Sequence, residues 1–233
     1  MKASTLAVGL LSVSLLWGSA ARANNSVTVG NANDGTCYPF SCAASEGITL
    51  FQQIFNGSSF SGSGYITSFD QTLFTALDYG PELLDSATYE IGFSTLPTYS
   101  LSPSPIDNIG FDYASFGAYS LGGLSPNILS FEGTPFYFDP AQGNLVMTVL
   151  ISDLTTSSNI YNAFYNSDHS IDQTFRCYGN VVACSVDKNA PVTTFNLVSS
   201  LSVPAPLPLL GVGAAFSFSR NYRRRIKAHR QNP

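Results

Sequence analysis

Histidine, cysteine, serine and paired carboxylates are the side chains with which this chain could carry out catalysis. Residues 24–202 contain one histidine, His169, and its polar segment 165–170 predicts an exposed loop. A Ser-His-Asp triad or a Cys-His pair would have to be built on that imidazole. Serines are abundant, but no Gly-x-Ser-x-Gly motif stands between a strand and a helix, and residues 57–64 indicate a flexible turn. We therefore expect that the protein is not an enzyme and has no catalytic residues.

The acidic residues offer many carboxylate pairs, so their number alone does not indicate a glycosidase. Asp139 stands out because it follows three aromatic residues, at 136–138, and precedes Pro140. An acid beside aromatic rings could lie on a surface where sugars stack. The favoured interpretation is a turn that an Asp-Pro pair starts after a strand.

Residues 31–35, Asn-Ala-Asn-Asp-Gly, resemble a fragment of a calcium loop. Side-chain oxygens stand at alternate positions before a glycine, but the later bidentate acid that such a loop needs is missing. Asn-Asp-Gly also predicts a plain turn, which is the favoured interpretation. We expect no cofactor and no metal site, with calcium as the alternative.

The four cysteines form two close pairs, Cys37 with Cys42 and Cys177 with Cys184. Four cysteines allow three disulfide connectivities. Pro39 lies in the first loop and Gly179-Asn180 in the second, and both sequences favour a chain reversal that brings the partners together. We predict two local disulfides. Zinc is disfavoured because neither spacing is Cys-x-x-Cys.

The elements that must hold these residues are predominantly β-strands. The chain from 24 to 195 is rich in Ser, Thr, Gly, Asn, Tyr and Phe, which is strand and turn composition. Strand-length patterns occur at 26–29, 48–55, 65–69, 87–94, 128–131, 144–151, 174–178, 181–186 and 192–198. Residues 87, 89, 91 and 93 should share one buried face, and 145–151 should form a central strand. Residues 81–84 hint at a short helical turn.

We therefore predict an all-β fold with a single β-sandwich or jelly-roll-like domain at residues 24–202. This domain holds all 15 acidic residues and two basic ones, Arg176 and Lys188, which gives it a net charge of −13. Such a charge repels phosphate backbones, so nucleic acid is not an expected partner.

The N-terminus has the pattern of a secretory signal peptide. An apolar stretch from Leu6 to Trp17 follows Lys2, and Ala21-Arg22-Ala23 is a small-x-small cleavage site. We predict a signal peptide helix at residues 1–23 that signal peptidase removes, so that the mature chain begins near Asn24.

The C-terminal segment 203–233 has three parts in order. A short proline motif comes first, a hydrophobic helix is predicted next over 207–218, and basic residues end the chain. The motif is Val203, Pro204, Ala205 and Pro206, and the basic residues are Arg220, Arg223, Arg224, Arg225, Lys227 and Arg230. A basic cluster after an apolar segment keeps the chain end in the cytoplasm.

This order of parts resembles the PEP-CTERM sorting signal that exosortases process, with Pro-Ala-Pro in place of Pro-Glu-Pro. Residues 51–56 and 131–145 also resemble exported proteins that carry such tails. The resemblance implies an exosortase-like processing enzyme, transient anchoring in the inner membrane through the tail alone, and then a place at the cell surface or outside the cell. The alternative for the tail is an ordinary single-pass membrane anchor.

We expect an exported, non-catalytic surface or extracellular-matrix protein. The alternative is a carbohydrate-binding module that attaches to matrix polysaccharide through exposed aromatic rings, with or without calcium. Three or more Tyr or Phe rings that are coplanar on one open sheet, or that line one groove, would favour the module. Buried rings would favour the structural role.

Overall fold

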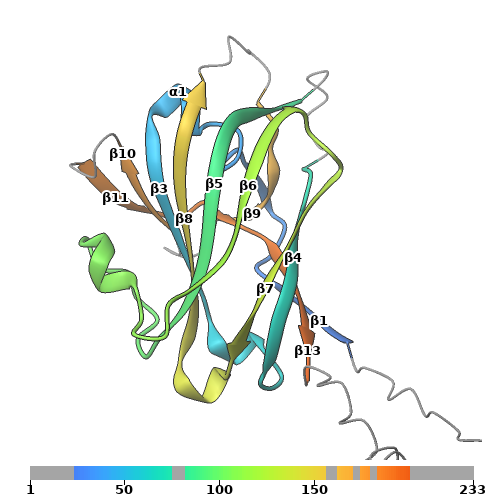
Figure 1. The fold of residues 1–233 in the computed structure, drawn as a ribbon, viewed down its shortest axis with the longest axis vertical. Helices are drawn as coiled ribbons and strands as arrows, with labels where there is room; N and C mark the ends of the chain where they lie inside the picture. Colours follow the sequence, from blue (N-terminus) through green and yellow to red (C-terminus); the bar gives the residue numbers. More distant parts are fainter. Residues whose placement is uncertain (1–23, 75–81, 156–161, 170–173, 179–182, 200–233) are drawn as a thin grey trace, which may run out of the picture.

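The computed structural model describes residues 24–74, 82–155, 162–169, 174–178 and 183–199 (Figure 1). Its regular structure is dominated by antiparallel strands, so the predicted all-β class is confirmed. The described helical elements are short: α1 (Ala43–Glu46), η1 (Gly57–Ser59), η2 (Pro105–Asn108) and η3 (Pro140–Gln142). The predicted signal-peptide and C-terminal helices lie outside the described residues.

The largest sheet has the strand order β11-β10-β3-β8-β5-β6. Its strands are β3 (Ile48–Phe55), β5 (Leu83–Leu96), β6 (Ala114–Leu124), β8 (Asn144–Thr155), β10 (Thr174–Tyr178) and β11 (Ala183–Asp187). β8 lies between β3 and β5, and its residues 144–149 are all buried. The predicted central strand is therefore confirmed, because a continuously apolar strand needs cover on both faces.

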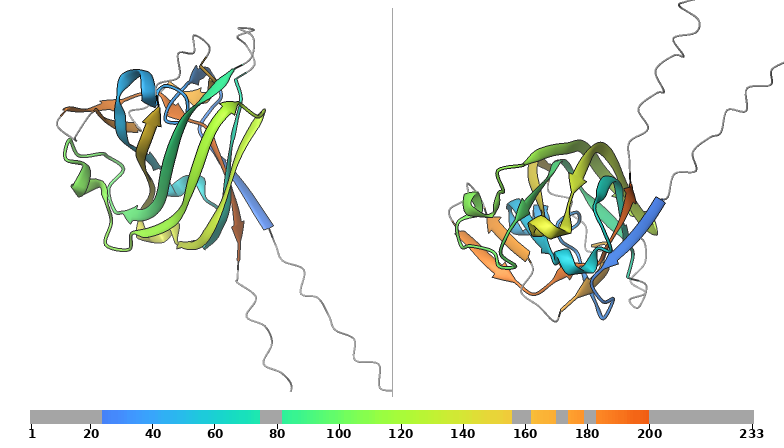
Figure 2. Two further views of the ribbon diagram at one scale, coloured as in Figure 1. Left: turned by 45° about the horizontal axis from the view of Figure 1, so that its top comes forward. Right: turned by 90° about the horizontal axis from the view of Figure 1, so that it is seen from below.

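A second sheet has the order β1-β13-β4-β7, and a third, small sheet has the order β12-β9-β2. The strands of the second are β1 (Asn24–Val29), β4 (Gly64–Thr72), β7 (Ile128–Phe138) and β13 (Thr193–Val198). Those of the third are β2 (Asp34–Thr36), β9 (Tyr165–Asp168) and β12 (Ala190–Pro191). The two larger sheets enclose a common core, as in a β-sandwich, and β6 lies beside β7 (Figure 2). There the hydroxyl of Tyr119 donates to the carbonyl of Glu132 at 2.7 Å.

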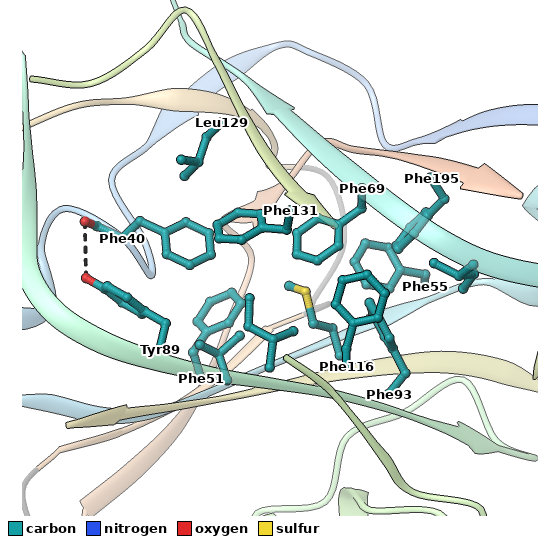
Figure 3. Close-up of a cluster of buried hydrophobic side chains, with 14 of the residues drawn as sticks. Phe40, Phe51, Phe55, Phe69, Tyr89, Phe93, Phe116, Leu129, Phe131 and Phe195 are labelled. Atoms are coloured by element: carbon teal, nitrogen blue, oxygen red, sulfur yellow. Dashed lines mark hydrogen bonds between the residues drawn. The ribbon is translucent and has the colours of Figure 1, made fainter. Parts of the chain in front are cut away.

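Aromatic side chains from both larger sheets fill the core (Figure 3). Phe69 of β4 stacks on Phe131 of β7 with 4.8 Å between the ring centroids. Phe69 also makes an edge-to-face contact with Phe93 of β5, with 5.9 Å between the centroids. Burying each such ring contributes about 1.5–3 kcal/mol. At one end of the cluster, the hydroxyl of Tyr89 donates to the backbone carbonyl of Phe40 at 3.3 Å.

The predicted buried face of β5 is confirmed, since residues 87, 89, 91 and 93 all lie in the core. The opposite face is only partly exposed, because Gly92 and Ser94 are also buried. The segment 97–113 folds back over this outer face, with η2 lying outside the large sheet (Figure 1). The Tyr113 ring lies so close to Gly92 that a Cβ there would be 2.4 Å from its hydroxyl oxygen. A side chain at position 92 would therefore displace the Tyr113 ring.

The covering segment is held by a second apolar cluster and by a buried amide pair. Leu101 packs with Leu50, Ile54, Val146 and Phe175 on the outer face of the sheet. Beside them, the side-chain nitrogen of Asn108 donates to the side-chain oxygen of Gln52 at 3.0 Å, and that of Gln52 donates to the carbonyl of Pro105 at 3.1 Å. Buried amides need such partners, so these bonds fix where the segment lies.

Two local expectations are wrong. Residues 165–168 form β9, with Tyr165, Ser167 and Asp168 buried, because this polar segment pairs with β2 on one side and β12 on the other. Leu83 and Leu84 begin β5 and not a helical turn, since they pair with β6. β6 itself had no strand signal, because glycines at 117, 122 and 123 interrupt its pattern.

Candidate functional site

Both predicted local disulfides are confirmed. Cys37 bonds to Cys42, with 5.4 Å between their Cα atoms, and Cys177 bonds to Cys184, with 4.1 Å. Cys177 and Cys184 lie directly opposite each other in the β10-β11 hairpin. The described cysteines are therefore all used in structure and none is a free thiol.

Arg176, next to Cys177 in β10, connects the β10-β11 hairpin to the loop closed by Cys37 and Cys42. Its guanidinium carbon lies 3.9 Å from the ring centroid of Tyr38, inside the first loop, and it forms a salt bridge with Asp187 of β11. The Tyr38 hydroxyl in turn donates to Glu46 of α1. Burial, followed by this hydrogen bond, raises the pKa of Tyr38 to about 12. Arg176, which is 8 % exposed, thus acts as a structural cation.

His169 is exposed, as predicted, but it is tied to the turn at 31–35. Its Nδ1 lies 3.1 Å from Oδ2 of Asp34, and its backbone N–H donates to Oδ1 of Asn33 at 3.1 Å. These contacts join the end of β9 to the start of β2. The imidazole therefore has a structural role, because it helps to hold the turn at 31–35 against the end of β9.

The contacts of His169 use side-chain oxygens of Asn33 and Asp34, which belong to the calcium-like segment 31–35. Asp34 also accepts the N–H of Gly35 at 2.8 Å. Asn31 lines a polar cavity of about 440 Å³ together with Asn56, Ser59 and Asp168. No group of three or more His, Cys, Asp or Glu side chains gathers to hold a metal within the described ranges. Calcium binding stays the untested alternative to the expectation of no metal site.

Asp139 starts the turn that was expected of it. Its Oδ1 accepts the N–H of Ala141 at 3.0 Å, and Pro140 opens η3 directly after β7. The same residue also lines a surface cavity of about 410 Å³. The other lining residues are Thr95, Pro97, Phe111, Asp112, Tyr137 and Gln142. The two interpretations of Asp139 are therefore compatible.

This cavity, which we call the Phe111 cavity, is formed where three connections meet. The end of β5 provides Thr95, the chain before β6 provides Phe111 and Asp112, and the β7-η3 junction provides Tyr137 and Asp139. Phe111 is 103 % exposed and Tyr137 is 51 % exposed. The cavity thus combines two exposed rings with two carboxylates.

Most other aromatic side chains belong to the core. The half-buried Tyr65 of β4 packs beside the exposed Tyr137, with 5.1 Å between the ring centroids and 59° between the planes. Two rings line this cavity, which is fewer than the three coplanar or groove-lining rings that would favour a carbohydrate-binding module. Sequence analysis identified Asp139 and its neighbouring aromatics, but not Phe111 or Asp112, because no local pattern connects residues 111–112 to 137–139.

Comparisons with protein-family models, with curated proteins and with solved structures find no match. No helix in the described part of the chain is long and apolar enough to cross a membrane. The predicted sorting motif at 203–206, the basic residues at 220–230 and the signal peptide at 1–23 lie outside the described residues.

Proposed function

We propose that this chain is an exported, non-catalytic protein of the cell surface or extracellular matrix. Signal peptidase removes residues 1–23, and the tail at 203–233, which resembles a PEP-CTERM signal, anchors the chain transiently in the inner membrane. An exosortase-like enzyme then processes the tail and releases the domain. Only the tail contacts the membrane, and nucleic acid is not a partner.

The observation that carries the proposal is the position of the two ends of the β-domain. Asn24, the residue after the expected cleavage site, already pairs within β1, and β13 ends at Val198, just before the tail. Asn24 lies opposite Val198 in the antiparallel pair (Figure 1). The N-terminus produced by signal peptidase and the C-terminus held by the membrane can therefore both extend from the same end of the folded domain. The two disulfides support an oxidising compartment.

Mass spectrometry of the extracellular fraction tests this proposal, because the mature termini report both processing events. Replacing Arg223, Arg224 and Arg225 with Gln should impair retention of the tail, since basic residues resist translocation. Replacing the same residues with Lys preserves the charge and should leave fractionation unchanged. An unchanged mature mass and distribution in the Gln variant would contradict the sorting role.

The non-catalytic part of the proposal has a separate measurement. Incubation of the protein with the polysaccharide of the producing cells should release no reducing ends. Release that Asp112→Asn or Asp139→Asn abolishes would show a hydrolase instead, with these two acids in its site.

A second candidate function is a carbohydrate-binding module, and the Phe111 cavity is the observation that favours it. Exposed rings beside polar groups suit a saccharide, whose C–H faces stack on aromatics while its hydroxyls form hydrogen bonds. Calcium assistance would draw on the polar cavity around Asn31 and Asp168. This function is compatible with export, because a matrix protein needs a means of attachment.

A further inference from the structure

Phe111 is displayed to solvent by a segment that is otherwise firmly held. The N–H of Gly110 donates to the Ser94 hydroxyl at 3.1 Å, and Asp112 Oδ1 accepts the N–H of Thr95 at 2.8 Å. One residue further on, Tyr113 packs against Gly92. Both neighbours of Phe111 are thus anchored to β5, while the ring itself is 103 % exposed.

Such exposure forgoes the roughly 1.5–3 kcal/mol that burying a phenylalanine contributes. The backbone on both sides of Phe111 is held by hydrogen bonds, so that only the side chain itself has to be ordered when a ligand arrives, which lowers the entropic cost of binding. The anchored backbone therefore indicates a preorganised contact surface.

The second ring of the cavity is held in place by packing. Tyr137 lies in β7, and Tyr65, its direct partner in β4, packs against its ring at 5.1 Å between centroids. Phe111 and Tyr137 therefore line one cavity of about 410 Å³, a volume within the range of small-ligand sites, and Tyr65 packs against Tyr137 without lining the cavity.

The polar groups of the cavity set the chemistry of the ligand. Asp112 and Asp139 each engage one carboxylate oxygen with a backbone N–H, at Thr95 and Ala141 respectively. Each carboxylate has a second oxygen, which can accept a hydrogen bond. Gln142 adds a side-chain amide with both donors and an acceptor. A ligand rich in hydroxyl groups uses both kinds of partner, whereas a cation uses acceptors alone.

The negative charge of the cavity and of the domain further restricts the class of ligand. Two carboxylates line the cavity, and the domain around it carries a net charge of −13. Uronic acids, sulfated sugars and phosphates would be repelled from this surface. Among saccharides, an uncharged one therefore suits this cavity better than an anionic one.

We propose that the Phe111 cavity binds a short stretch of neutral polysaccharide, with sugar rings stacked on Phe111 and Tyr137 and hydroxyls donating to Asp112 and Asp139. The inference deepens the proposed function, which supplies the extracellular setting. The cavity lies at the end of the domain from which the tail leaves, since Val198 pairs with Tyr65 and Tyr65 with Tyr137. Residues 199–206, between β13 and the hydrophobic segment, reach at most about 29 Å. A tail-anchored chain would thus hold the cavity close to the envelope.

Calorimetry and native affinity electrophoresis of the purified full chain test the proposal. The neutral probes are dextran, laminarin and galactomannan, and the charged probes are polygalacturonate and poly-lysine. About 0.3 M NaCl screens the basic tail. At least one neutral probe should bind, and Phe111→Ala and Tyr137→Ala should each weaken that binding by about tenfold or more.

Ile106→Ala is the matched control, because Ile106 is an apolar residue of the same segment, is 70 % exposed and does not line the cavity. It should bind as the unaltered chain does, and so should Tyr137→Phe, which keeps the ring. All variants should melt at the same temperature as the parent, which separates lost contacts from lost folding.

Failure of every neutral probe to bind would overturn the inference. Equal binding by Phe111→Ala, or a preference for polygalacturonate or poly-lysine, would overturn it too. These outcomes differ from failure of the export proposal, because binding by purified protein does not depend on where the cell sends it. A chain that is correctly processed but binds no glycan would support the export proposal and overturn the binding proposal.

Discussion

Asp85 joins three parts of the fold through one nearly buried carboxylate. It lies on β5 with 2 % of its surface exposed, and its Oδ2 accepts the N–H of Ala44 at 3.0 Å, at the start of α1. Its own N–H donates to the carbonyl of Phe40 at 2.9 Å. Burial raises the pKa of Asp85, although the hydrogen bonds from α1 oppose this shift.

A raised pKa makes the stability contribution of Asp85 depend on pH. The folded state holds this proton more tightly than the unfolded chain, so the contribution is present below the ordinary aspartate pKa near 4 and is lost as the pH rises through the raised value. Asp85→Asn removes this titration. The stability of the variant relative to the parent should therefore increase from about pH 4 to pH 7.

Urea denaturation at a series of pH values measures this change. Glu90→Gln, which alters an exposed acid on the same strand, corrects for the general effect of removing one negative charge. A relative stability of Asp85→Asn that stays constant with pH, or falls as the pH rises, would refute the assignment.

Among the elements, the hairpin β10-β11 and the loop before α1 are each closed by a disulfide and are joined by Arg176 and Tyr38. Each disulfide spans a short loop, with sequence separations of 5 and 7. Short loops remove little entropy from the unfolded chain, so these bridges should act as local clamps and not as determinants of the fold.

We predict that replacing either cysteine pair with alanine lowers the free energy of unfolding by about 2 kcal/mol and leaves a folded protein. Urea denaturation with a circular dichroism readout measures this loss. Because Arg176 and Tyr38 connect the two loops, removal of both bridges should cost a different amount from the sum of the single losses. A chain that fails to fold after loss of one bridge would show that the disulfide does more than close its loop.

At the scale of the whole molecule, charge is strongly segregated. All 15 acidic residues lie between Asp34 and Asp187, whereas six of the ten basic residues lie at 220–230. Mutual repulsion within the acidic domain opposes its compact state, and dissolved salt screens this repulsion.

The melting temperature should therefore rise when NaCl increases from about 0.01 M to about 0.3 M, where the Debye length has become shorter than the domain. For a domain of this size, about 1 kcal/mol corresponds to about 2–4 °C. CaCl₂ at matched ionic strength tests the calcium prediction in the same experiment, with MgCl₂ as the control. A larger rise with CaCl₂ than with MgCl₂ would indicate a selective site, and a fall with NaCl would contradict the repulsion argument.

The sequence by itself determined the features that depend on local pattern. Residues 48–55 and 174–178 alternate or run apolar over the full length of β3 and β10, and the observed bounds match the predicted ones. The two disulfides and the Asp139 turn were also predictable, because a short loop with proline or Gly-Asn brings its own ends together. Period-two alternation identified the core face of β5 for the same reason.

Only the tertiary structure decided which strands became neighbours and which rings stayed in water. β6 has no clear alternation and is a strand because β5 pairs with it, and polar β9 is a strand because β2 and β12 flank it. Phe111 has the same residue type as the core phenylalanines, yet it is exposed because its neighbours are anchored to β5. The periodicity of apolar residues along one segment indicates only which face of that segment is buried. The Phe111 cavity and the pairing of β1 with β13 depend on contacts between segments far apart in the chain, which no local pattern encodes.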